Sequence, residues 1–98
     1  MLIVYQTANS NTPAIKSDAT ALASNTKRNG WMIQNLGTNP LFVRLGSGAS
    51  TSVFHIVLKG GTGNDDGLGA TVAQTSGAVF TGEISVAGTS PRDTVLEM

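Results

Sequence analysis

The only histidine of the chain, His55, precedes its only pair of adjacent acids, Asp65 and Asp66, in a glycine-rich stretch. A histidine with carboxylates can act as a general base or bind a metal ion. A zinc site needs three or four ligands, and because the chain has no cysteine, carboxylates would have to supply the rest. A general base needs a nucleophile nearby, but Ser and Thr are too abundant here to identify one. We therefore interpret His55 as a polar strand residue or as a contact to a neighbouring protein.

The two acids belong to the sequence GNDDG, which begins at Gly63. It matches the calcium-loop pattern only in part, because no glutamate follows at the required spacing. It is not a phosphate-binding loop either, because Asp66 stands where the third glycine of a G-x-G-x-x-G motif from Gly61 would be. Asn, Asp and Gly are the ordinary residues of turns. We predict an exposed, turn-rich loop, and we expect no catalytic residue, no cofactor and no metal ion.

The charge balance does not favour nucleic acid or a membrane as a partner. Lys and Arg number 6 and Asp and Glu number 6, so the formal net charge is zero. The small basic group at Thr26–Arg28 is interpreted as a solvated junction, and Tyr5 and Trp31 are too far apart to indicate a base-stacking platform. The apolar run at the N-terminus ends after a few residues without a basic region before it, which does not fit a signal peptide.

Charged residues make up only 12% of the chain, about half the usual share in globular domains. Ser, Thr, Asn and Gln must therefore supply most of the polar surface. A neutral and weakly charged surface gives little protection against association. We infer that much of this surface contacts other protein.

The first part of the chain is expected to be an extended arm, residues 1–29. Residues 2–7 are strand-forming, whereas residues 8–29 are small and polar and are predicted to contribute little to a core. Asp18–Ala23 fits either one helical turn or a short strand. The remaining residues, 30–98, are expected to form the folded domain.

Short alternating segments follow from Gly30 onward. Residues 30–37 and 40–46 are predicted to pair as a hairpin around Pro40, and residues 51–59 form a strand with Phe54 pointing inward. Residues 60–77 are mostly loop with a short strand around 71–73, and two further strands follow. The predicted core consists of Trp31, Ile33, Leu41, Val43, Leu45, Phe54, Ile56, Leu58, Phe80, Ile84, Val86 and Leu96.

No amphipathic helix separates these segments, and glycine, proline and asparagine turns join them. The pattern predicts an all-β fold: a small antiparallel β-sandwich or jelly-roll-like barrel with an extended N-terminal arm.

The ordered combination of GWMIQNLG, GSGAS, FHIVL, DDG and SVAGTSPR resembles small virion proteins of tailed bacteriophages. The resemblance covers residues 30–98. It implies a capsid cement or decoration protein, which caps the joints between capsid subunits as a small β-sandwich, often as a trimer or dimer. The expected partners are the major capsid protein and further copies of the chain, the expected location is the capsid surface of the virion, and no enzymatic activity is expected.

Two other functions stay open. One is a tail-associated or fibre-associated adhesin module that binds host surface glycans. The other is a small hydrolase that uses His55 with Asp65 or Asp66. The candidate contact residues fall into an apolar group and a polar group: Leu2, Val4, Tyr5 and Phe42, and His55, Asp65 and Asp66.

Overall fold

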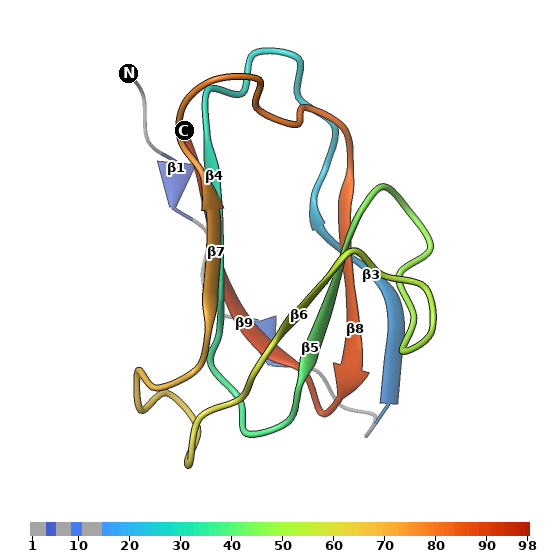
Figure 1. The fold of residues 1–98 in the computed structure, drawn as a ribbon, viewed down its shortest axis with the longest axis vertical. Helices are drawn as coiled ribbons and strands as arrows, with labels where there is room; N and C mark the ends of the chain where they lie inside the picture. The colour runs from blue at the N-terminus through green and yellow to red at the C-terminus, as the bar shows by residue number, and fades with distance from the viewer. Residues whose placement is uncertain (1–3, 6–8, 11–14) are drawn as a thin grey trace.

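The structure is a computed structural model that describes residues 4–5, 9–10 and 15–98, with side chains from Asp18 onward. Two antiparallel β-sheets face each other, and the described residues contain no helix (Figure 1). This confirms the predicted all-β class and the antiparallel β-sandwich.

Each sheet is built from strands that lie far apart in the sequence. Sheet A has the order β1-β9-β4-β7, with β2 also paired to β9, and sheet B has the order β3-β8-β5-β6. The strands of sheet A are β1 (Val4–Tyr5), β2 (Asn9–Ser10), β4 (Trp31–Asn35), β7 (Thr71–Gln74) and β9 (Arg92–Glu97). The strands of sheet B are β3 (Ile15–Leu22), β5 (Leu41–Leu45), β6 (Ile56–Leu58) and β8 (Ile84–Thr89).

The hydrophobic core lies between the two sheets. The core follows from the alternation of side chains along the strands. β4 buries every second side chain along its length, and β5 does so over its first three residues. Burial of each large apolar side chain is worth about 1.5–3 kcal/mol. The buried part of the predicted core consists of Trp31, Ile33, Leu41, Val43, Leu58, Ile84 and Val86, with Leu45, Ile56 and Phe80 packed against it.

Residues 30–46 do not form a hairpin, contrary to the prediction. β4 pairs with β7 and β9 in sheet A, whereas β5 pairs with β6 and β8 in sheet B. The turn before β5 therefore carries the chain from one sheet to the other. Alternation could not reveal this, because two strands that pair side by side and two that face each other across a core show the same burial pattern.

Two predicted core residues are not buried. Phe54 is 40% exposed, because β6 begins only at Ile56 and the preceding loop crosses the outer face of sheet B. Leu96 is half-buried, whereas Val95 is buried, because Val95 pairs with the inward-facing Ile33. The alternation in β9 was assigned to the wrong face, since the inward face also carries an acid, Asp93.

Residues 15–22, which the sequence places in the arm, form β3 at the edge of sheet B. Ala21 and Leu22 are buried in the core, so the prediction that residues 8–29 contribute little to it is wrong for this segment. Of the two alternatives for Asp18–Ala23, the structure shows the strand, and the small side chains and irregular register explain why the sequence did not decide between them. Asp18 has a positive φ of 51° at a register shift between Lys16 and Ala19, which interrupts the alternation of side chains.

The loop between β5 and β6, residues 46–55, covers part of the outer face of sheet B. The Ser85 hydroxyl of β8 donates to the Gly46 carbonyl (2.6 Å) and accepts from the Ala49 backbone N–H (3.1 Å). The Asp18 N–H in turn donates to the Ala49 carbonyl (2.8 Å). These bonds explain why Ser85, on the face opposite to the core, is fully buried.

The loop between β6 and β7, residues 59–70, packs against the turn that follows β4. The Gly61 N–H donates to the Gly37 carbonyl (2.9 Å), and the Asp65 N–H donates to the Leu36 carbonyl (2.7 Å). At Gly69 the backbone approaches β4 so closely that an added Cβ would overlap the carbonyl oxygen of Asn35. The loop is thus held by close backbone contacts that only glycine permits.

We expect Gly69→Ala to lower the free energy of unfolding by about 1–3 kcal/mol, because the new methyl group has to push the loop off β4. Gly63→Ala in the same loop is the matched control, since nothing lies within 4 Å of an added Cβ there. Urea denaturation of both variants checks this. Equal stabilities of the two variants would show that the loop does not need its close approach to β4.

Candidate interaction surface

His55 lies on the surface directly before β6, and its ring takes part in the strand pairing. The Leu45 backbone N–H donates to His55 Nδ1 (3.0 Å), and the His55 N–H donates to the Val43 carbonyl (2.8 Å). The side chain therefore extends the contact between β5 and β6 beyond the regular ladder. His55 is thus a polar residue that flanks the strand without belonging to it, and a contact of His55 to a neighbouring protein stays a prediction.

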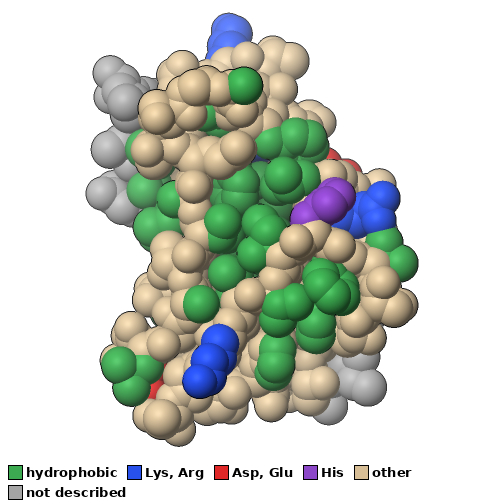
Figure 2. Space-filling model, viewed as in Figure 1, with side chains coloured by type: hydrophobic (Ala, Val, Ile, Leu, Met, Phe, Trp, Pro, Cys, Tyr) green, Lys and Arg blue, Asp and Glu red, His purple; other side chains and the backbone are tan. Residues whose placement is uncertain are grey.

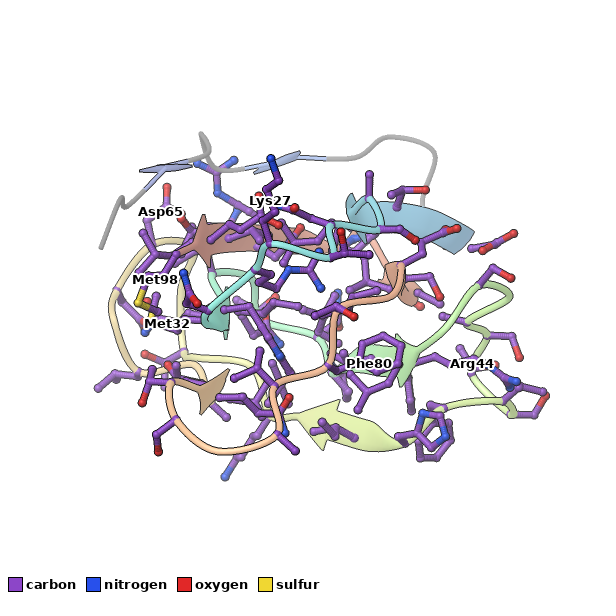
Figure 3. All side chains as sticks on the ribbon, turned by 90° about the horizontal axis from the view of Figure 1, so that it is seen from above. Lys27, Met32, Arg44, Asp65, Phe80 and Met98 are labelled. Atoms are coloured by element: carbon purple, nitrogen blue, oxygen red, sulfur yellow. The ribbon has the colours of Figure 1, made fainter. Side chains whose placement is uncertain are left out.

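The two acids of the loop lie away from the histidine. Asp65 bonds to the turn before β5, whereas His55 bonds to the end of β5. Figure 3 shows this separation, with Asp65 and Arg44 of β5 on opposite sides of the molecule. The structure does not bring His55 together with the acids that a hydrolase would need.

Asp66 organises the loop by accepting hydrogen bonds. Its carboxylate accepts from the Leu68 N–H (2.9 Å), the Gly63 N–H (2.8 Å), and the N–H (2.9 Å) and hydroxyl (2.8 Å) of Thr62. These donors, the Leu68 N–H foremost, lower the pKa of Asp66 to about 2. The carboxylate is thus engaged with its own loop, which agrees with turn chemistry.

Asp65 ties the loop to sheet A. Both of its carboxylate oxygens accept from Arg92 of β9, at 2.6 and 2.7 Å. The hydrogen bond from Arg92 holds the pKa of Asp65 below its usual value and raises the pKa of Arg92. Because the pair is solvent-exposed, its contribution to stability is small despite the good geometry.

Three of the apolar candidates lie in the N-terminal arm. Leu2 lies outside the described residues. Val4 and Tyr5 form β1, which pairs with β9 at Glu97 and Leu96, and their side chains lie outside the described part. A role of these three residues in contacts with other protein stays a prediction.

Phe42 belongs to an exposed apolar cluster on the outer face of sheet B. Its ring packs against Phe54 with the centroids 5.0 Å apart, and it pairs across the strands with Val57. Phe54 and Val57 are 40% and 46% exposed. We call Phe42, Phe54 and Val57 the β6 surface. Val53, which precedes Phe54 in the chain, is exposed as well. The sequence predicts Phe54 in the core, so its exposed position on this surface was not expected.

Basic side chains border the β6 surface at both ends of the strand. Lys59 follows β6 directly, and Arg44 lies on β5 next to Leu45, whose N–H binds His55. Figure 2 shows the histidine beside a basic side chain, with hydrophobic side chains across the middle of the same face. Among the described residues, the salt bridges are Arg28–Glu97 and Arg92–Asp65, so neither Arg44 nor Lys59 is paired there.

Arg28 is buried, whereas the sequence analysis predicted a solvated junction. Its side chain is 0% exposed, and its Nε donates to Glu97 of β9 (2.9 Å). Its remaining nitrogens donate to the carbonyls of Ala23 (2.6 Å), Phe80 (2.9 Å) and Gly82 (3.0 Å). Apart from Ala23, the partners lie far away in the sequence, so no local pattern could have indicated this role.

Asp93 is the second buried charge that the sequence analysis missed. It is 1% exposed, it points into the sandwich from β9, and neither carboxylate oxygen has a hydrogen-bond partner. Burial raises the pKa of Asp93 to about 6. Asn35, its register partner on β4, instead donates to the carbonyls of Asn39 and Leu58.

Two general features complete the description of candidate sites. Within the described residues, no group of three or more His, Cys, Asp or Glu side chains is placed to hold a metal ion. In the same part of the chain, no helix has the length and apolar character needed to cross a membrane. Comparisons with protein-family models, curated proteins and solved structures found no match.

Proposed function

We propose that this chain is a structural protein of a bacteriophage virion, of the capsid cement or decoration type. It binds the major capsid protein on the capsid surface as a homo-oligomer, a trimer or dimer, and stabilises the shell. Its action is binding without turnover. The sequence motifs that resemble small virion proteins are the first support for this proposal.

The single observation that carries the proposal is the β6 surface. An exposed aromatic and aliphatic cluster on a small, weakly charged sandwich is typical of a protein that contacts other protein. Each such contact is small, but many copies around a shell add their contacts together. A protein of this size can therefore stabilise a capsid without any single strong contact.

Purified phage particles test the proposal. We expect mass spectrometry to find the chain in intact virions, and cryo-electron microscopy to place copies at the joints between capsid subunits. Particles assembled without the chain are expected to release their DNA at a lower temperature. Absence of the chain from virions would contradict the proposal, and copies restricted to the tail would contradict the cement role.

The adhesin function has one observation in its favour. The Phe42–Phe54 pair places an exposed aromatic ring beside the loop of residues 46–55, and glycans often stack on such rings. A glycan array separates the two functions. Binding that is lost in Phe54→Ala would favour the adhesin, whereas no binding at high protein concentration would leave the cement role.

A further inference from the structure

β6 forms one edge of sheet B. In the described part of the chain, its strand neighbour is β5, so its other side carries backbone N–H and C=O groups without a ladder partner. One of these, the Leu58 carbonyl, accepts from the Asn35 side chain (2.9 Å). The Lys59 carbonyl also accepts from the Ala70 N–H (2.8 Å), so Ile56 and Val57 are the part of the edge that is left for an added strand. Adding a strand to such an edge is a common way for a sheet to bind an extended peptide.

The side chains on the outer face of this edge form an ordered series. Successive residues of a strand alternate between the two faces, so His55, Val57 and Lys59 share the outer face with Phe42 and Arg44 of β5. The middle of the edge is apolar, with Lys59 at one end and His55 at the other, and Arg44 lies behind the edge on β5. A strand added here would meet apolar contacts at its centre, the ammonium of Lys59 at one end and the imidazole of His55 at the other.

The charges point to the kind of segment that fits. Neither Arg44 nor Lys59 forms a salt bridge with a described residue. The His55 to Lys59 span covers four residue steps, about 13 Å at strand spacing. A carboxylate at the first and fifth residues of an added strand would lie on the outer face, one beside His55 and one beside Lys59, with an apolar residue between them. Arg44 lies one strand further away, on β5.

We propose that the β6 edge binds an extended segment of another protein that has apolar residues at its centre and an acidic residue at each end. The segment adds to sheet B as a further strand next to β6. The inference rests on the proposed function only for the identity of the protein that supplies the segment, which would be the major capsid protein.

A short peptide tests the binding chemistry without any virion. The probe is the blocked peptide Thr-Glu-Val-Val-Val-Glu-Thr, titrated into the isotope-labelled chain and followed by the amide NMR signals. We expect shifts centred on Ile56, Val57 and Leu58 at millimolar peptide, and weaker binding at higher salt because the end charges are screened. The matched peptide with Lys in place of both Glu is expected to bind at least about tenfold more weakly.

Two variants of the chain sharpen the test. Val57→Lys places a charge at the apolar centre and is expected to abolish the shifts, while unchanged signals elsewhere show that the fold is intact. Lys59→Glu reverses the charge at one end of the edge. It is expected to reduce the difference in affinity between the acidic peptide and the basic peptide. Equal binding of both peptides to the unchanged chain, or shifts away from β6, would overturn the proposal.

The remaining outcomes separate this inference from the function above. If the chain itself dimerises in sedimentation and Val57→Lys makes it monomeric, the edge binds a second copy and the proposal is wrong. If the chain is found in virions but the acidic peptide does not bind, only the β6 proposal fails. If the peptide binds but virions lack the chain, only the capsid function fails.

Discussion

Replacing Arg28 with methionine is expected to lower the free energy of unfolding by about 3–5 kcal/mol, the usual cost of removing one partner of a buried ion pair. The guanidinium is fully buried and satisfies Glu97 together with the carbonyls of Ala23, Phe80 and Gly82. Methionine fills much of the same space but donates no hydrogen bond. The carboxylate of Glu97, whose side chain is 17% exposed, and three carbonyl oxygens would then lose their donors.

Urea denaturation measures this loss, and the adjacent Lys27→Met is the matched control. Lys27 is exposed, so its replacement is expected to change stability by no more than about 0.5 kcal/mol. The free energy of unfolding of Arg28→Lys is expected to lie between those of the two methionine variants. An ammonium keeps the charge, but it lacks the planar guanidinium that donates to all four acceptors. If Arg28→Met and Lys27→Met proved equally stable, the buried arginine would not hold the loops to β9.

Asp93→Asn is expected to stabilise the protein at pH 8 and to lose this advantage as the pH falls to 4. The pKa of Asp93 is raised to about 6 by burial, above its ordinary value of 3.8. The folded state therefore holds the proton more tightly, so stability is highest below pH 4 and falls as the pH rises through 6. The shift of the pKa of Asp93 from 3.8 to about 6 corresponds to a loss of about 3 kcal/mol in the free energy of unfolding between low and high pH.

The measurement is the unfolding free energy of the variant and of the unchanged chain from pH 4 to pH 8. Asp66→Asn, followed further down to pH 2, is a control of opposite sign, because hydrogen bonds lower the pKa of Asp66 to about 2. Its carboxylate stabilises the fold above pH 4, and this contribution disappears as the pH falls through 2. A stability difference for Asp93→Asn that stayed constant between pH 4 and pH 8 would contradict the role of the buried charge.

The sequence was sufficient for the fold class because that depends on local patterns. Alternation and turn residues predicted the strand around 71–73, the two strands that follow it and the turn chemistry of Asp66. β7, β8, β9 and the four hydrogen bonds of Asp66 agree. The assignment of strands to sheets depends instead on pairing between distant segments. For this reason the prediction of a hairpin around Pro40 was wrong.

The features missed by the sequence analysis share one cause. Each of these residues lies where its type is uncommon. Charged side chains are usually exposed, yet Arg28 and Asp93 are buried, and aromatic rings are usually buried, yet Phe54 is exposed. Their positions are set by acceptors and neighbours that lie in other parts of the chain, or by the path of a loop. At β3 the sequence left a short strand and a helical turn both open for Asp18–Ala23, because the side chains are mostly small and the register is interrupted at Asp18.

The arrangement of β8 and β9 has a consequence for synthesis. These two strands follow each other in the sequence, yet each lies inside a different sheet, β8 between β3 and β5 and β9 between β1 and β4. Among the strands that the structure describes, β3 and β1 have no partner before the ribosome has made β8 and β9, while β4 can pair with β7 and β5 with β6. Neither sheet can nucleate fully on a partial chain, so the sandwich is expected to fold as one unit once both strands have emerged.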